Sequence, residues 1–145
     1  MVRILENSPI AIAPYFDGKH SSIIYTHQGS FRFVETVDEI LECYCVMNGA
    51  SMEGRLHAVR KKCGFRKNPP AFLYPLEIVA LPLPSSCGEG TIWVMDLDFK
   101  IIKNESSCCR IVFSNNLEIP IALTIETIKL RRSRAFEVLH TFNHV

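Results

Sequence analysis

The stretch SIIYTHQGSFRFVETVDEILECYCVMNG, residues 22–49, predicts two strands that lead directly into a helix. Aromatic and β-branched residues are frequent in its first half, which favours strands over Ser22–His27 and Ser30–Glu35. Gln28-Gly29 stands between these two segments and predicts a hairpin turn. The first part of the chain is therefore expected to form an antiparallel hairpin.

The second half of the stretch predicts a helix. Thr36 precedes Glu39 by three residues, which is the spacing of a capping box, so the helix is expected to span about Val37 to Met47. Its apolar residues recur at helical spacing. Asn48-Gly49 is expected to end it, because glycine readily takes the left-handed conformation found at helix C-termini.

A second helix is expected to follow after a short connection. Ser51 can cap it, and it should run to about Cys63 with Gly64 as its stop. Its apolar residues form one stripe, and its basic residues lie off that stripe, where they face water or a partner. Asn68-Pro69-Pro70 blocks further helix, since each proline lacks a backbone donor and restricts the residue before it.

The remainder of the chain predicts four strands and one more helix. The expected strands are Leu76–Leu81, Thr91–Leu97, Cys109–Ser114 and Leu117–Leu123. Asn115-Asn116 predicts a two-residue hairpin turn between the last two, because asparagine tolerates positive φ. Pro120 predicts that the last strand lies at a sheet edge. The final helix is expected over about Glu126 to Phe142.

These elements predict an α+β fold with a mainly antiparallel sheet, two central helices and a basic C-terminal helix. The length of 145 residues fits a single domain, residues 1–145. No apolar run approaches the roughly 18–20 residues of a membrane span. The N-terminus lacks the apolar stretch of a secretory signal, so a cytoplasmic location without a membrane partner is expected.

The cysteines and small motifs do not indicate a metal site or an enzyme. All six cysteines are expected to be reduced thiols, because the chain shows no sign of export. Cys43-Tyr44-Cys45 and Cys108-Cys109 lack the C-x₂-C spacing that suits zinc. The second glycine of Gly49–Gly54 comes one residue late for a nucleophile elbow, and there is no P-loop or dinucleotide fingerprint. We therefore expect no metal, no cofactor and no catalytic residues.

Basic residues gather in two clusters, although the net charge is only +1. No acidic residue occurs from Gly54 to Leu76, where the first cluster lies, and the second cluster lies in the expected final helix. The clusters are Arg55, Arg60, Lys61, Lys62, Arg66 and Lys67, and then Lys129, Arg131, Arg132 and Arg134. These ten residues are candidate DNA contacts, because DNA affinity comes largely from neutralised phosphates and arginine also enters narrow A·T minor grooves. Solvated helix faces and an acidic protein partner are the alternatives.

Two residues at the start of the second helix carry a more specific expectation. Gly54 would let this helix approach another backbone closely. Arg55, the next residue, is expected either to contact DNA or to pair with Glu53 or another acid.

Part of the central sequence resembles a known family. CVMNGASMEGR, residues 45–55, has the form C-x₃-G-x-S-x₂-G-R and is followed by Asn68-Pro69-Pro70. Both features resemble the central segment of the ComK-type competence transcription factors.

Further segments are similar to the same family, in the same order along the chain. Leu81–Cys87 is similar to the stretch that precedes the family's tryptophan strand, and Trp93-Val94 is similar to that strand. Ile111–Asn116 followed by Ile119–Ile121 is similar to a V-x-F-S-N-G then L-P-I hairpin, with Asn116 in place of the turn glycine.

The resemblance, which covers about Phe31 to Arg132, implies a function. It implies an activator of competence (DNA-uptake) genes that binds double-stranded, A/T-rich boxes through the minor groove. It also implies a homo-oligomer, a dimer or a pair of dimers on DNA, located at the nucleoid with RNA polymerase as a further partner. The alternative is a protein-interaction module, or an inactive paralogue, whose basic surface binds an acidic protein.

Overall fold

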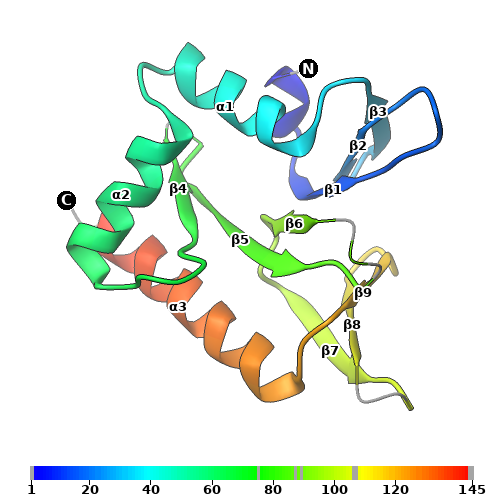
Figure 1. Ribbon diagram of the computed structural model, residues 1–145. Helices are drawn as coiled ribbons and strands as arrows, with labels where there is room; N and C mark the ends of the chain where they lie inside the picture. The colour runs from blue at the N-terminus through cyan, green and yellow to red at the C-terminus, as the bar shows by residue number, and fades with distance from the viewer. Residues whose placement is uncertain (1, 75, 87, 89, 106–107, 144–145) are drawn as a thin grey trace.

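The computed structural model describes residues 2–74, 76–86, 88, 90–105 and 108–143 (Figure 1). Within them it forms a short 3-10 helix, nine strands and three α-helices, so the predicted α+β class is confirmed. The elements are η1 (Val2–Glu6), β1 (Pro9–Pro14), β2 (Ser22–Thr26), β3 (Gly29–Phe33), α1 (Val37–Met47), α2 (Met52–Cys63), β4 (Ala71–Leu73), β5 (Ile78–Pro84), β6 (Thr91–Val94), β7 (Phe99–Lys103), β8 (Cys109–Phe113), β9 (Glu118–Ile121) and α3 (Ile125–Asn143).

The described strands form two antiparallel sheets. The larger sheet has six strands in the order β3-β2-β1-β6-β5-β4, and the smaller has the order β7-β8-β9. β1 lies in the interior of the larger sheet, between β2 and β6, yet the sequence did not predict it. Its residues Ile10 to Ala13 are all buried, so the strand lacks the polar–apolar alternation by which a half-exposed strand is recognised. β4 and β7 were also missed.

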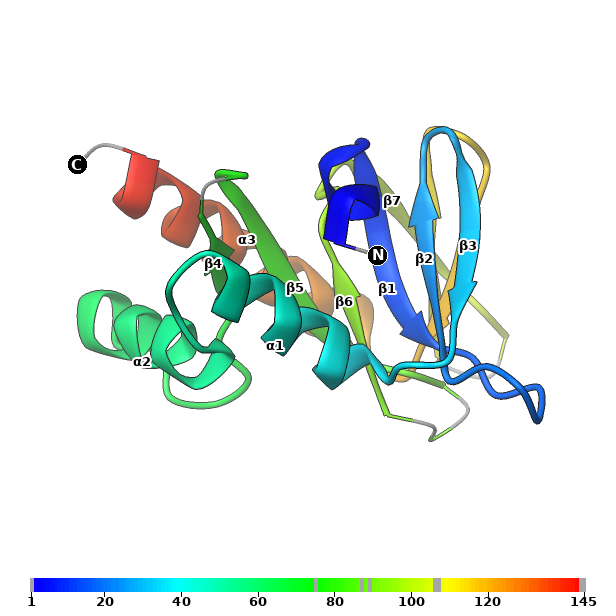
Figure 2. The same cartoon turned by 90° about the horizontal axis from the view of Figure 1, so that it is seen from above.

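Each face of the six-stranded sheet packs against a different layer. Ala11 and Ala13 of β1 face a core shared with α3 and the small sheet, whereas Ile12 and Trp93 face a core shared with α1. Figures 1 and 2 show α1 on one side of the sheet, with α3 and the small sheet on the other. No helix in the described part of the chain is long and apolar enough to cross a membrane.

The predicted helix boundaries are confirmed by capping contacts. The hydroxyl of Thr36 accepts a hydrogen bond from the Glu39 backbone N–H at 3.2 Å, and that of Ser51 accepts one from the Gly54 backbone N–H at 3.0 Å. Gly64 has a φ of 75° and donates its N–H to the carbonyl of Arg60, which ends α2. Local sequence therefore fixes both central helices.

Both observed hairpin turns begin one residue earlier in the chain than predicted. Thr26 pairs with Gly29, so the first turn is His27-Gln28 rather than Gln28-Gly29. The connection between β8 and β9 has four residues, Ser114 to Leu117, and Asn116 takes the left-handed position with a φ of 69°. Pro120 lies in β9 at the edge of the small sheet, as predicted.

The described cysteines are free thiols. No disulfide joins the cysteines among the described residues, which are Cys43, Cys45, Cys63, Cys108 and Cys109. Cys87 lies outside the described residues. Burial raises the pKa of the Cys45 thiol, which disfavours its reactive thiolate form.

The left-handed turn residue gives a prediction for stability. Asn116→Ala should lower the free energy of unfolding by about 1 kcal/mol, because alanine lacks the short polar side chain that makes the left-handed conformation tolerable for asparagine. Asn116→Gly should keep or raise the stability, since glycine, without a Cβ, takes this conformation readily. Asn115→Gly is the control and should be destabilising, because the Asn115 side chain accepts the Leu117 N–H at 3.1 Å. Urea unfolding measures all three, and equal stability of the alanine and glycine variants at 116 would contradict the assignment.

Candidate nucleic-acid interface

The first basic cluster lies on the last turn of α2 and on the loop that follows it. The exposed cations there are Arg60, Lys61, Lys62, Arg66 and Lys67. The three on the helix are placed where the negative end of the helix dipole favours positive charge. Arg60 donates from Nε to the carbonyl of Arg66 at 3.4 Å, and the loop leaves through the buried Pro69-Pro70. The loop backbone is thus held at both ends.

Two of the three arginines of the second cluster turn toward the sheets. Arg131 donates from Nη1 to the carbonyl of Pro82 at 3.2 Å, and Arg132 donates to the carbonyl of Phe99 at 2.6 Å. The Arg132 guanidinium also lies 4.5 Å from the centroid of the Phe99 ring. Both arginines are half-buried, so they join α3 to the strands beneath it, whereas Lys129 is exposed.

The loop after α2, which carries part of the first cluster, contacts α3, which carries the second. The Arg134 guanidinium lies 5.4 Å from the centroid of the Phe65 ring, and Phe65 belongs to the loop after α2. Arg131 and Asn68 of the same loop line one small cavity of about 90 Å³. α2 and α3 are neighbours in both views (Figures 1 and 2). Segments about 65 positions apart in the sequence therefore lie in contact. We use the name basic surface for the ten predicted contacts on and beside them.

None of the ten basic residues forms an ion pair within the described part of the chain. Ion pairs there join His20 to Asp17, His27 to Asp96 and Arg110 to Glu118, and none involves the ten basic residues. Burial, and then the nearby charge of Arg134, lowers the pKa of Arg131. A cation that lacks an acidic partner gains most from an external anion.

Arg55 differs from the other members of its cluster. It is half-buried, and its Nη2 donates to the carbonyl of Tyr74 at 3.0 Å. Its buried Nε has no hydrogen-bond partner among the described residues, where no acid pairs with the guanidinium either. Arg55 also lines an apolar groove of about 290 Å³ together with Phe72, Tyr74 and Phe142.

The expectation for Gly54 is wrong. Gly54 is exposed, and a Cβ added to it would meet only the hydroxyl of Ser51, at 3.1 Å. α2 turns Val59 toward the core instead, so the close approach to another backbone does not occur at Gly54.

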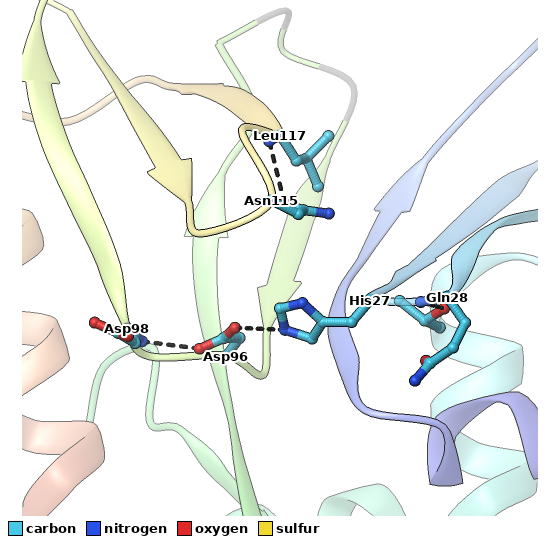
Figure 3. Close-up of polar contacts among 7 residues, drawn as sticks. His27, Gln28, Asp96, Asp98, Asn115 and Leu117 are labelled. Atoms are coloured by element: carbon cyan, nitrogen blue, oxygen red, sulfur yellow. Dashed lines mark hydrogen bonds and ion pairs between the residues drawn. The ribbon is translucent and has the colours of Figure 1, made fainter.

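A larger polar groove lies away from the basic surface. It has a volume of about 540 Å³ and runs between the β2–β3 turn and the β8–β9 loop. His27 Nε2 lies 2.9 Å from Asp96 Oδ2, which ties this turn to the end of β6 (Figure 3). The groove contains none of the ten predicted contacts, so we do not place phosphate there.

The fold and the basic surface together define an α+β protein whose cations gather beside α2 and α3. The family model of the ComK protein matches residues 3–144, nearly the whole chain. The chain belongs to the ComK family, so the resemblance is confirmed, and membership suggests a competence transcription factor. No curated protein and no solved structure matches the chain.

The contrast between Arg132 and Lys129 gives a second prediction. Arg132→Ala should lower the free energy of unfolding by about 1–3 kcal/mol, because it removes a hydrogen bond from a charged donor and a cation–π contact. Lys129→Ala, on the exposed side of the same helix, should stay within about 0.5 kcal/mol of the wild type. Thermal and urea unfolding of both variants test this difference, and equal losses would refute the positioning role of Arg132.

Proposed function

We propose that this chain is a sequence-specific DNA-binding transcription activator of competence genes and not an enzyme. It binds A/T-rich duplex boxes through the minor groove as a homo-oligomer, and RNA polymerase is its further partner at the nucleoid. The observation that supports the proposal is that the two basic clusters lie on elements in contact with each other, and that none of their ten residues forms an ion pair among the described residues. Family membership supports the same function.

The exposed cations are suited to phosphate contacts. Lysine and arginine that face solvent release condensed counterions when they meet the DNA backbone, and this release supplies most of the sequence-independent affinity. The proposed phosphate contacts are Arg60, Lys61, Lys62, Lys67 and Lys129. Four arginines of the basic surface are half-buried and already contact carbonyls or rings of this chain. We propose that they also hold the basic surface in place. They are Arg55, Arg131, Arg132 and Arg134.

Arg66 is suited to reading a minor groove. It is exposed, and the contact from Arg60 engages its backbone carbonyl and leaves its side chain free to extend. Arginine is favoured over lysine in a narrow A·T groove, because its guanidinium is more weakly hydrated and loses less on leaving water. We therefore propose Arg66 as the residue that gives A/T preference.

The phosphate role predicts a change in salt dependence. Replacing Lys61 and Lys62 by alanine should weaken binding to A/T-rich and G/C-rich duplexes alike. It should also flatten the slope of log K against log salt by about 0.9 for each lost contact. Lys100→Ala combined with Lys103→Ala is the matched control, because both lysines are exposed on β7 outside the basic surface. Gel shifts at several salt concentrations give the slopes, and an unchanged slope in the Lys61 and Lys62 variant would exclude these contacts.

The reader role predicts a loss of preference at nearly constant charge. Arg66→Lys should reduce the ratio of A/T-rich to G/C-rich affinity while the salt slope stays close to the wild-type value. Lys67→Ala should do the reverse, with a flatter slope and an unchanged ratio. An Arg66→Lys variant that keeps the wild-type ratio would remove Arg66 as the reader. A wild-type chain that binds neither duplex would favour an acidic protein as the partner instead.

A further inference from the structure

Three of the four described sheet edges carry features that prevent pairing with another strand. Exposed edges present unpaired N–H and C=O groups, and proteins protect them with short strands, covering helices, proline or lysine. β4 has only three residues, all buried, and contacts α2 and α3. β9 carries Pro120, and β7 carries the exposed Lys100 and Lys103.

The fourth edge, β3, carries neither proline nor lysine. Its five residues pair with β2 in an uninterrupted register, without a bulge, and contain no proline. Its only charged residue is Arg32, which is exposed and whose guanidinium lies 4.7 Å from the centroid of the Tyr15 ring. Phe31 at the centre of the strand is 40% exposed, and Val34 directly after it is 65% exposed. Figure 2 shows β3 outermost in the larger sheet.

We propose that β3 is the strand through which two copies of this chain pair, edge to edge and antiparallel about a two-fold axis. An axis at Phe31 places Phe31 opposite its own counterpart and Ser30 opposite Arg32 of the second copy. It also places Gly29 opposite Phe33, which is a favourable combination because an aromatic ring covers an edge glycine. An axis at Arg32 would instead oppose two like charges. The strand is therefore self-complementary in one register.

The pairing is expected to be reversible in the absence of DNA. One edge strand from each copy buries less than the roughly 1,200 Å² of a standard stable interface, so the dimer should depend on protein concentration. Its test needs no DNA, and its failure would leave the DNA-binding proposal standing.

Charge substitutions at Ser30 test both the interface and its register. Sedimentation analysis of the wild-type chain over a concentration series should show a monomer–dimer equilibrium. Ser30→Glu should lower the dimer Kd and Ser30→Lys should raise it, each by about 2- to 30-fold, since two symmetry-related pairs with Arg32 change. Ser30→Lys combined with Arg32→Glu should return the Kd toward the wild-type value, because opposite charges again face each other. Circular dichroism confirms that each variant is folded.

A matched substitution on another edge locates the interface. Phe31→Lys should abolish the dimer, because it places two ammonium groups opposite each other at the axis. Ile102→Lys should leave the Kd unchanged, although Ile102 is a similarly exposed apolar residue on edge strand β7, at 37%. A wild-type chain that stays monomeric at its solubility limit would overturn the proposal. A dimer that is insensitive to Ser30 and Phe31, or equally sensitive to Ile102, would overturn it as well.

Discussion

Burial of the six-stranded sheet on both faces is the constraint on which the rest of the structure depends. Ile12 pairs with Ile24 on one side and Trp93 on the other, and all three side chains lie in the core beneath α1. The opposite face needs a second cover of its own, which α3 and the small sheet provide together. Because α3 is part of this second cover, its arginine-rich sequence lies against an apolar surface.

That requirement explains why the arginines of α3 are divided between two tasks. Ile128, Ala135 and Val138 supply the apolar stripe of the helix, while Arg131 and Arg132 at its border extend to carbonyls of β5 and β7. A long side chain can bury its stem and keep its charged end hydrogen-bonded, so a basic residue at such a border still stabilises the packing. A third arginine, Arg134, lies over the Phe65 ring and so joins α3 to the loop after α2.

The sequence predicted the features that depend on neighbouring residues and missed those that depend on distant ones. Both caps of the central helices and the edge position of Pro120 follow from local chemistry and are confirmed. β1 escaped prediction because a strand buried on both faces has no alternation. The role expected for Gly54 was wrong because its neighbours depend on how α2 packs. Composition identified the basic clusters, but only the structure shows which arginines turn inward.

The position of the basic surface relative to β3 links the two proposals. α2 packs against β4, at the end of the larger sheet opposite to β3. A dimer joined through β3 would form a continuous sheet of twice six strands, with one basic surface at each far end. Adjacent strands lie about 4.8 Å apart, so the two β4 strands would be separated by roughly 50 Å before twist is considered. A helical turn of DNA spans about 34–36 Å, and a two-fold dimer contacts one side of a duplex at whole numbers of turns, so the twist of the joined sheet would have to bring the two basic surfaces from about one and a half turns to a whole number.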